Sequence, residues 1–142
     1  MSSSAVKKSL ALFLVFFALL VGCTTTIKKR KDPVFNVSTD SLNAGLVNLV
    51  TCEHITLDGE DINTNGKDSS ELEIDLINAR NIPKSDDSLR AFGRPIALLM
   101  KNALKDRNEY DRLSVYFVQT DTSAVVVKRN WKGFIFPSTD LQ

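Results

Sequence analysis

The chain has little of the chemistry that most enzymes and metal proteins use. It contains two cysteines, Cys23 and Cys52, and one histidine, His54, among 142 residues. Two thiols form at most one bridge, which excludes a fold built on several disulfides. Cys52 and His54 stand two residues apart and could supply a nucleophile with its base, or half of a metal site. No third group that would orient the imidazole is visible, so we expect a buried thiol beside a half-exposed histidine.

A long hydrophobic run is also missing. The longest apolar stretch, residues 10–21, follows Lys7 and Lys8. As a helix it would cover about 18 Å, which is too short for the roughly 30 Å hydrocarbon core of a bilayer. A basic start, a short apolar centre and a small residue at the end are typical of a secretory signal peptide. We therefore expect residues 1–22 to be removed from the mature protein.

The end of that stretch is more specific. Leu20-Val21-Gly22-Cys23 resembles the lipobox of bacterial lipoproteins. The resemblance implies cleavage before Cys23 and acylation of its thiol and its new amino group, which would hold the protein at a membrane. In such lipoproteins of diderm bacteria, an Asp after the acylated cysteine can retain the protein in the inner membrane. Thr24 follows here, so the resemblance favours a lipid-anchored outer-membrane protein that faces either the periplasm or the cell surface.

The segment after the anchor differs in charge from the rest of the chain. Residues 23–32 show no hydrophobic periodicity, and we expect a lipid-anchored tether that reaches at most about 30 Å. Its four consecutive cations, residues 28–31, could lie on anionic headgroups or be solvated. Residues 33–142 carry twelve basic and sixteen acidic side chains, so we expect one small, mildly acidic domain. The net acidic charge of this domain argues against nucleic acid as a partner.

Hydrophobic periodicity predicts an α+β domain with the element order α-β-β-α-β-β. A short amphipathic helix over 39–50, with its cap at 39–41, is followed by two strands that a long, turn-rich loop separates. A long helix then begins near Ser85 or Asp86, with a kink or restart at Gly93-Arg94 because Pro95 removes a backbone hydrogen bond. Two more strands complete the pattern. The predicted strands cover 52–57, 71–79, 113–119 and 124–136, the last with a bulge near Gly133, and the loop covers 58–70.

The simplest arrangement of these elements is one four-stranded antiparallel sheet that the long helix covers on one face. The strand over 71–79 alternates between apolar and acidic side chains, which indicates one buried face and one wet face. Carboxylates on alternate strand positions are also the geometry of two-carboxylate hydrolases, although a plain wet face has the same pattern. The side chains of this acidic row are Glu71, Glu73 and Asp75.

The predicted loop contains Asp61-Ile62-Asn63-Thr64-Asn65-Gly66, which resembles the first half of an EF-hand calcium loop. The resemblance implies that Asp61, Asn63 and Asn65 are ligands and that Lys67 offers its carbonyl oxygen. The twelfth position is Leu72, where that family has a bidentate glutamate, and a strand follows instead of a helix. The loop is thus a weak calcium candidate, and an Asx- and Gly-rich hairpin loop is the alternative.

Two further features could meet a partner. The long helix carries a basic stripe opposite its apolar face, although solvated helix faces have the same pattern. Trp131 lies between basic residues in the last strand, where it either fills the core or forms an exposed patch for a ligand or partner. The basic stripe consists of Arg90, Arg94, Lys101 and Lys105.

The domain is also similar, in a general way, to the small uncharacterised lipoproteins of diderm bacteria. The similarity lies in its size, its strand–helix–strand–strand ending and its Asn108-Glu109-Tyr110-Asp111 stretch before a strand, and it implies no activity and no cofactor. Because no catalytic constellation stands out, we expect a non-enzymatic envelope lipoprotein that binds a protein or glycan and holds the membrane through Cys23. The alternatives are a calcium-stabilised binding module and an envelope hydrolase that uses Cys52 with His54 or the acidic row.

Overall fold

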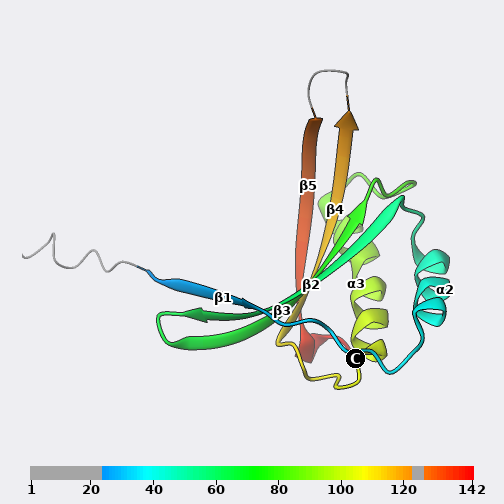
Figure 1. The fold of residues 1–142 in the computed structure, drawn as a ribbon. Coiled ribbons are helices and arrows are strands. Elements are labelled where there is room, and N and C mark those ends of the chain that lie inside the picture. Colours follow the sequence, from blue (N-terminus) through cyan, green and yellow to red (C-terminus); the bar gives the residue numbers. More distant parts are fainter. Residues whose placement is uncertain (1–23, 123–126) are drawn as a thin grey trace, which may run out of the picture.

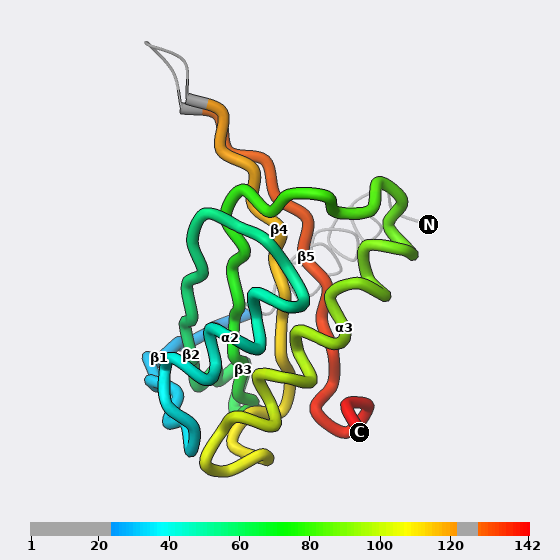
Figure 2. The backbone as a smooth tube through the Cα atoms, turned by 90° about the vertical axis from the view of Figure 1, so that its right-hand side faces the viewer, coloured from blue at the N-terminus to red at the C-terminus, as the bar shows by residue number. Residues whose placement is uncertain are grey.

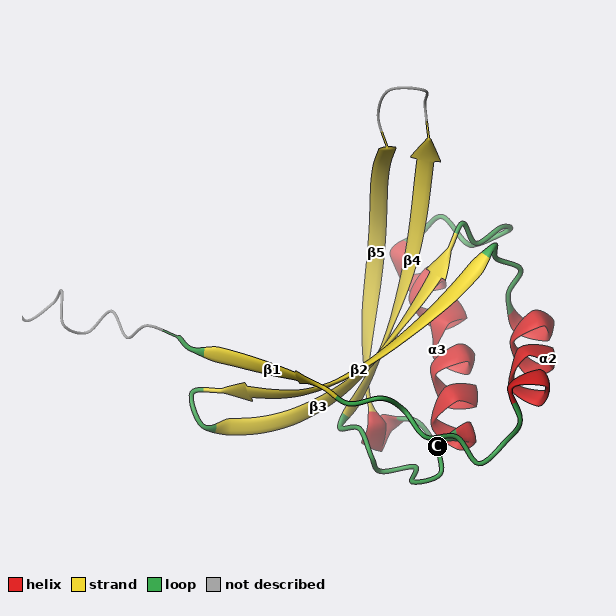
Figure 3. Cartoon of the chain, viewed as in Figure 1, coloured by secondary structure: helices red, strands yellow, loops and turns green. Residues whose placement is uncertain are grey.

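The computed structural model describes residues 24–122 and 127–142. The expected signal peptide, Cys23 and the first residues of the strand expected from position 124 lie outside the described residues. Strands dominate the described part of the chain (Figure 3). In chain order its elements are β1 (Thr26–Arg30), α2 (Thr39–Leu49), β2 (His54–Thr64), β3 (Lys67–Ile77), α3 (Asp86–Ala103), β4 (Arg112–Thr122), β5 (Val127–Pro137) and the short 3-10 helix η1 (Ser138–Asp140).

The strands form one mixed sheet in the order β1-β2-β3-β4-β5. Neighbours pair antiparallel except β3 and β4, which run parallel from Glu71↔Arg112 to Ile77↔Val118. The predicted four-stranded antiparallel sheet with the order α-β-β-α-β-β is therefore wrong. The cause is the crossover: α3 returns the chain along the sheet to the end where β3 begins, so β4 starts there and runs in the same direction as β3.

The additional strand comes from the segment expected to be an irregular tether. β1 pairs with β2 from Thr26↔Thr64 to Arg30↔Glu60, and all five of its residues are exposed. Backbone pairing at a sheet edge requires a neighbouring strand but no apolar face. Hydrophobic periodicity therefore cannot detect a strand such as β1.

The long loop predicted between the first two strands is also wrong. β2 and β3 are each eleven residues long and are joined by the two-residue turn Asn65-Gly66, whose φ angles are 52° and 80°. A tight type I′ hairpin turn requires positive φ at both positions, which asparagine and glycine tolerate. Residues 58–70 resemble a loop in sequence because polar side chains occupy both faces of this hairpin end.

The two hairpins diverge away from the helices. In Figure 1, β1 and the turn end of β2 and β3 extend to the left, whereas β4 and β5 extend upward. Helices α2 and α3 contact each other and lie on one face of the sheet (Figure 2). The opposite face carries no helix in the described part of the chain, and we call it the open face.

The core lies between α3 and the sheet, as predicted. Leu72, Ile74 and Leu76 of β3 are fully buried in one cluster with Ile96 and Met100 of α3. The alternation expected for this strand is thus confirmed, because its apolar side chains face the helices. Serine side chains cap both helices: Ser85, one of the two expected positions, caps α3, whereas the cap of α2 is one residue before the expected range, at Ser38.

Helix α3 is continuous, so the restart expected near Pro95 does not occur. Pro95 is exposed, and so is Ala91, whose carbonyl loses its helical partner. Water can bind that carbonyl, which lowers the cost of the proline. Gly93, by contrast, is buried against the rings of Phe117 and Phe136. Neither helix in the described residues has the length and apolar character needed to span a membrane.

Tyr110 attaches the end of the β1 segment to the domain. Its side chain is buried, and its hydroxyl donates a 2.8 Å hydrogen bond to the carbonyl of Lys31, the residue after β1. The Lys31 N–H donates to the carbonyl of Gly59 on β2 at 2.8 Å, and the Lys31 ammonium lies 5.2 Å from the centre of the Tyr110 ring. Burial raises the pKa of Tyr110 to about 12, so its hydroxyl remains a donor at neutral pH.

Gly59→Ala should lower the free energy of unfolding by about 1–3 kcal/mol, because the packing around Gly59 leaves no room for a methyl group. An added Cβ would lie 2.0 Å from the Lys31 carbonyl oxygen and 2.3 Å from the Tyr110 hydroxyl. Urea unfolding followed by circular dichroism measures the change. Gly45→Ala is the control, because its Cβ would meet only the flexible end of Leu99, at 3.1 Å, and alanine favours the helix. Equal destabilisation by the two substitutions would contradict the role given to Gly59.

Candidate functional site

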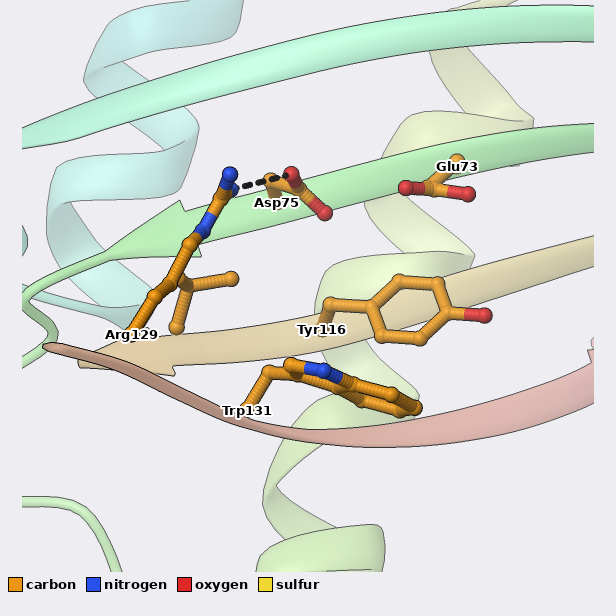
Figure 4. Close-up of a pocket in the computed structure, with 6 residues that line it drawn as sticks. Glu73, Asp75, Tyr116, Arg129 and Trp131 are labelled. Atoms are coloured by element: carbon orange, nitrogen blue, oxygen red, sulfur yellow. Dashed lines mark hydrogen bonds and ion pairs between the residues drawn. The ribbon is translucent and has the colours of Figure 1, made fainter. Parts of the chain in front are cut away.

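Strand alternation places polar and aromatic side chains from three neighbouring strands on the open face. In the sheet register, Asp75 of β3 lies beside Tyr116 of β4, and Val118 of β4 lies opposite Trp131 of β5. These side chains surround a hollow of about 380 Å³, shown in Figure 4, which falls in the size range of small-ligand sites. The hollow is lined by Glu73, Asp75, Tyr116, Val118, Arg129 and Trp131.

Two aromatic rings form one side of the hollow. Trp131 is 64% exposed, and its ring meets the Tyr116 ring edge-on with the centroids 5.6 Å apart. Gly133 makes room for this arrangement, since a Cβ there would lie 2.2 Å from Cε1 of Tyr116. The β4–β5 register is unbroken from Arg112↔Pro137 to Thr122↔Val127, so the bulge predicted near Gly133 is wrong. The glycine instead leaves room for the Tyr116 ring against the backbone of β5.

The three carboxylates of the acidic row differ in their partners. Glu71 accepts hydrogen bonds from Nε of Arg112 at 2.8 Å and from the hydroxyl of the fully buried Ser114. Asp75 lies 3.4 Å from the guanidinium of Arg129. Glu73 lies between them and has no cation within ion-pair distance in the described part of the chain. Among the described residues this carboxylate therefore has no ion-pair partner, and the charge of Lys28, which pairs with Glu60, acts on it only from a longer distance.

The pKa values agree with this imbalance. Burial raises the pKa of Glu73, and the nearby carboxylates of Asp75, Glu71 and Glu60 raise it further, whereas the charge of Lys28 lowers it. The pKa of Asp75 is also raised by burial, although the charge of Arg129 acts in the opposite direction. A cation that enters the hollow would stabilise the ionised form of Glu73.

Three of the four side chains of the predicted basic stripe already bind backbone carbonyls near the C-terminus. Arg90, Arg94 and Lys101 extend from α3 toward the end of β5 and the segment after it, whereas Lys105 lies exposed beyond the helix. The carbonyl partners are Ile135 for Arg90 at 3.2 Å, Asp140 for Arg94, and Ser138 and Leu141 for Lys101 at 2.6 and 2.8 Å. These cations thus hold the last residues of the chain against α3.

The three calcium candidates belong to the β2–β3 hairpin rather than to a coiled loop. Asp61 lies 3.5 Å from the ammonium of Lys31. The side-chain oxygen of Asn63 accepts from the N–H of Gly66 at 3.1 Å, and that of Asn65 accepts from the N–H of Thr25 at 2.9 Å. Across residues 24–122 and 127–142, no group of three or more His, Cys, Asp or Glu side chains is arranged to hold a metal ion.

His54 is the first residue of β2 and Cys52 lies two residues before it; both line a groove beside α2. Cys52 is half-buried, and burial raises the pKa of its thiol. A raised pKa favours the protonated thiol, whereas a nucleophilic cysteine needs the thiolate. His54 is exposed, as is its neighbour Glu53.

The sequence pattern indicates Trp131 and the acidic row as separate features and does not group them. The grouping depends on the parallel pairing of β3 with β4, which no local pattern indicates. Tyr116 was not among the residues that the sequence singled out. The alternation within β4 carried a usable signal, because Leu113, Val115 and Phe117 are buried on the helix side and Tyr116 must then face the other way.

Comparison with known proteins gives no family for this chain. No family model and no curated protein matches it. A solved structure to which it is similar is titled "Crystal structure of Sex pheromone staph-cAM373 precursor", with a TM-score of 0.48 and 9% sequence identity. The match covers 83% of this chain and 42% of that chain, so this chain spans less than half of that protein's length. A likeness at this level supports no statement about function.

Glu73→Gln should raise the free energy of unfolding near neutral pH and change it little in acid. A carboxyl group whose pKa is raised by folding binds its proton more tightly in the folded state, so stability falls as the pH rises from the ordinary value of 4.5 through the raised pKa. Glutamine removes this loss. Urea unfolding at about pH 3.5 and about pH 7 measures the difference. Asp121→Asn removes an exposed charge from β4 as a control, and an equal gain there would attribute the effect to net charge alone.

Proposed function

We propose that the protein is a lipid-anchored lipoprotein of the cell envelope that binds a basic segment of a partner protein on the open face of its sheet. The tetrad that ends at Cys23 supports the anchoring, and Thr24 after it favours the outer membrane. The observation that carries the binding role is the position of Glu73. Within the described residues this carboxylate has no cation partner, and it lies in a hollow lined by Tyr116 and Trp131.

A lysine ammonium or an arginine guanidinium matches this site in two ways. It can form charge-assisted hydrogen bonds to Glu73, which are stronger than bonds between neutral groups. It can also lie over an aromatic face, and tryptophan is the side chain that attracts cations most strongly in this way. The exposed ring of Trp131 lines the same hollow as Glu73, so both interactions are available to one cationic group.

The charge of the whole domain favours the same class of partner. Residues 33–142 carry sixteen acidic and twelve basic side chains, and three of those basic side chains bind carbonyls near the C-terminus. A negative surface raises the association rate of a positive segment and disfavours acidic partners. The long-range attraction of the acidic domain and the local contacts at Glu73 therefore both favour a positively charged partner.

Binding is better supported than hydrolysis at either group considered from the sequence. The two oxygens of Glu71 accept from Arg112 and Ser114, which leaves the acidic row without a second free carboxylate next to Glu73. Asp75 is close to Arg129. The raised pKa of Cys52 acts against a nucleophilic role for its thiol.

Trp131 is the single tryptophan of the chain, so its fluorescence reports on the site directly. Titration of the acylated protein with a tetralysine peptide should change this emission, and added salt should weaken the binding. Glu73→Gln should lower the affinity about tenfold or more, since a hydrogen bond to a charged group contributes roughly 1.5–3 kcal/mol.

The matched control for this titration is Ile135→Ala. Ile135 lies on the same face of β5 and is 48% exposed, but it does not line the hollow, so its loss should leave the affinity unchanged. Unchanged affinity in Glu73→Gln would contradict the proposed site. Tighter, salt-independent binding of neutral glycan fragments would contradict the proposed class of partner.

Cys23→Ser should abolish incorporation of labelled palmitate when the full chain is expressed in a diderm bacterial host. The reason is that the thiol of Cys23 is the proposed acyl acceptor. Cys52→Ser is the matched control and should retain the label, because it removes the other thiol of the chain. Label in Cys23→Ser, or none in the unchanged protein, would contradict the anchoring.

A further inference from the structure

The first strand begins almost immediately after the proposed anchor. Only Thr24 and Thr25 separate Cys23 from Thr26, the first residue of β1. The pairing extends beyond β1 itself: the N–H of Asn65 donates to the carbonyl of Thr25 at 3.1 Å, and the N–H of Thr25 donates to Oδ1 of Asn65 at 2.9 Å. The turn of the β2–β3 hairpin is therefore bonded to the second residue after Cys23.

Covalent geometry limits the distance between the acylated residue and this turn. Consecutive Cα atoms are about 3.8 Å apart, so Cα of Cys23 lies within about 7.6 Å of Cα of Thr25. A paired residue on the next strand is about 5.5 Å further. The polar headgroup region of one leaflet is about 5–8 Å thick. If the acyl chains are in the bilayer, the turn lies within about 13 Å of Cα of Cys23, which is close enough for the turn to reach the headgroup region.

The residues around this turn have side chains suited to that region. We call residues 24–26 and 64–67 the hairpin tip; they comprise threonines, Asn65, Gly66 and Lys67. The tip contains hydroxyl and amide groups that can bond to headgroups, one exposed cation and no carboxylate. Asp68, the nearest acidic residue, accepts a 2.6 Å hydrogen bond from the amide of Asn63.

The four cations at positions 28–31 are less able to bind lipid by charge alone, because most of them pair with carboxylates of the protein. Three of its four cations have a carboxylate partner within 4 Å, and in the described residues only Lys29 lacks one. The pairs are Lys28 with Glu60 at 2.6 Å, Arg30 with Asp32 at 2.7 Å and Lys31 with Asp61 at 3.5 Å. Of the two alternatives for these cations, solvation or contact with headgroups, the ion pairs disfavour the second, and contact through the hairpin tip takes its place.

We propose that the hairpin tip rests on the lipid headgroups and that β1, paired to β2, holds the domain in one orientation on the membrane. This inference rests on the lipid anchoring proposed above. Glu73 is six residues along β3 from Lys67, which places the open-face site at most about 20 Å from the tip along the strand. A free tether would let the site face any direction, whereas the paired strand restricts binding to partner segments close to the membrane.

The test uses a fluorophore on a single thiol of the acylated full chain. In a Cys52→Ser background, Lys67→Cys places the label in the tip, and Lys84→Cys places it in the loop after β3, at the far end of that strand. The proteins are reconstituted into vesicles of phosphatidylethanolamine and phosphatidylglycerol that carry a quencher on the headgroup. Quenching at position 67 should be several-fold stronger than at position 84.

A pair of proline variants tests whether β1 causes the orientation. Thr25 and Lys31 both form backbone hydrogen bonds with β2 or its turn. In an antiparallel pair every second residue bonds to the neighbouring strand, so the N–H of Lys29 points toward β2 and that of Arg30 points away. Lys29→Pro should break the pairing and reduce the difference between the two labels, whereas Arg30→Pro should retain it.

Flotation of the vesicles separates the two proposals. Protein that floats with the vesicles but shows equal quenching at positions 67 and 84 overturns the orientation and leaves the anchoring intact. Protein that does not float overturns the anchoring, and the orientation with it. A difference that survives in Lys29→Pro as fully as in Arg30→Pro overturns the role given to β1.

Discussion

The parallel pairing of β3 with β4 is the constraint on which the rest of the structure depends. It places β3 at the centre of the sheet, where Leu72, Ile74 and Leu76 are fully buried under α3. Because strand side chains alternate, the other face of β3 must then carry the acidic row. The same pairing sets Asp75 beside Tyr116 of β4. The hollow on the open face is thus a direct consequence of one strand register.

That pairing also explains the divergence of the two hairpins. Residues 71–77 of β3 pair with residues 112–118 of β4, although each strand is eleven residues long. The turn end of β2 and β3 therefore extends past β4, and the distal end of β4 and β5 extends past β3 (Figure 1). Polar side chains suit both projecting ends, since neither has a helix to cover it. β1 adds a third strand to the first of these ends, which makes a two-stranded hairpin, marginally stable alone, into part of a larger sheet.

The sequence predicts what local chemistry determines and misses what depends on remote partners. The helices, the cap at Ser85 and the alternation of β3 follow from residues close together in the chain, and all three are present. β1 and the parallel pairing depend on segments far away, so periodicity could not indicate them. The candidate site divides in the same way. Trp131 and the acidic row were identified, but the basic stripe on α3 binds backbone carbonyls near the C-terminus, and no sequence pattern reveals such partners.

The partial neutralisation of the acidic row supports a binding role for Glu73 rather than that of an ordinary solvent-exposed residue. Arg112 and Arg129 are placed to compensate Glu71 and Asp75, but the residue between them is left half-buried among other carboxylates. Folding therefore keeps a charge in a position that destabilises the free protein. A bound cation would relieve this repulsion, so the free energy lost in the free state is regained in the complex. Stability and affinity are thus expected to be coupled at this one side chain, and under the proposed orientation β1 would hold that side chain at a fixed distance from the membrane.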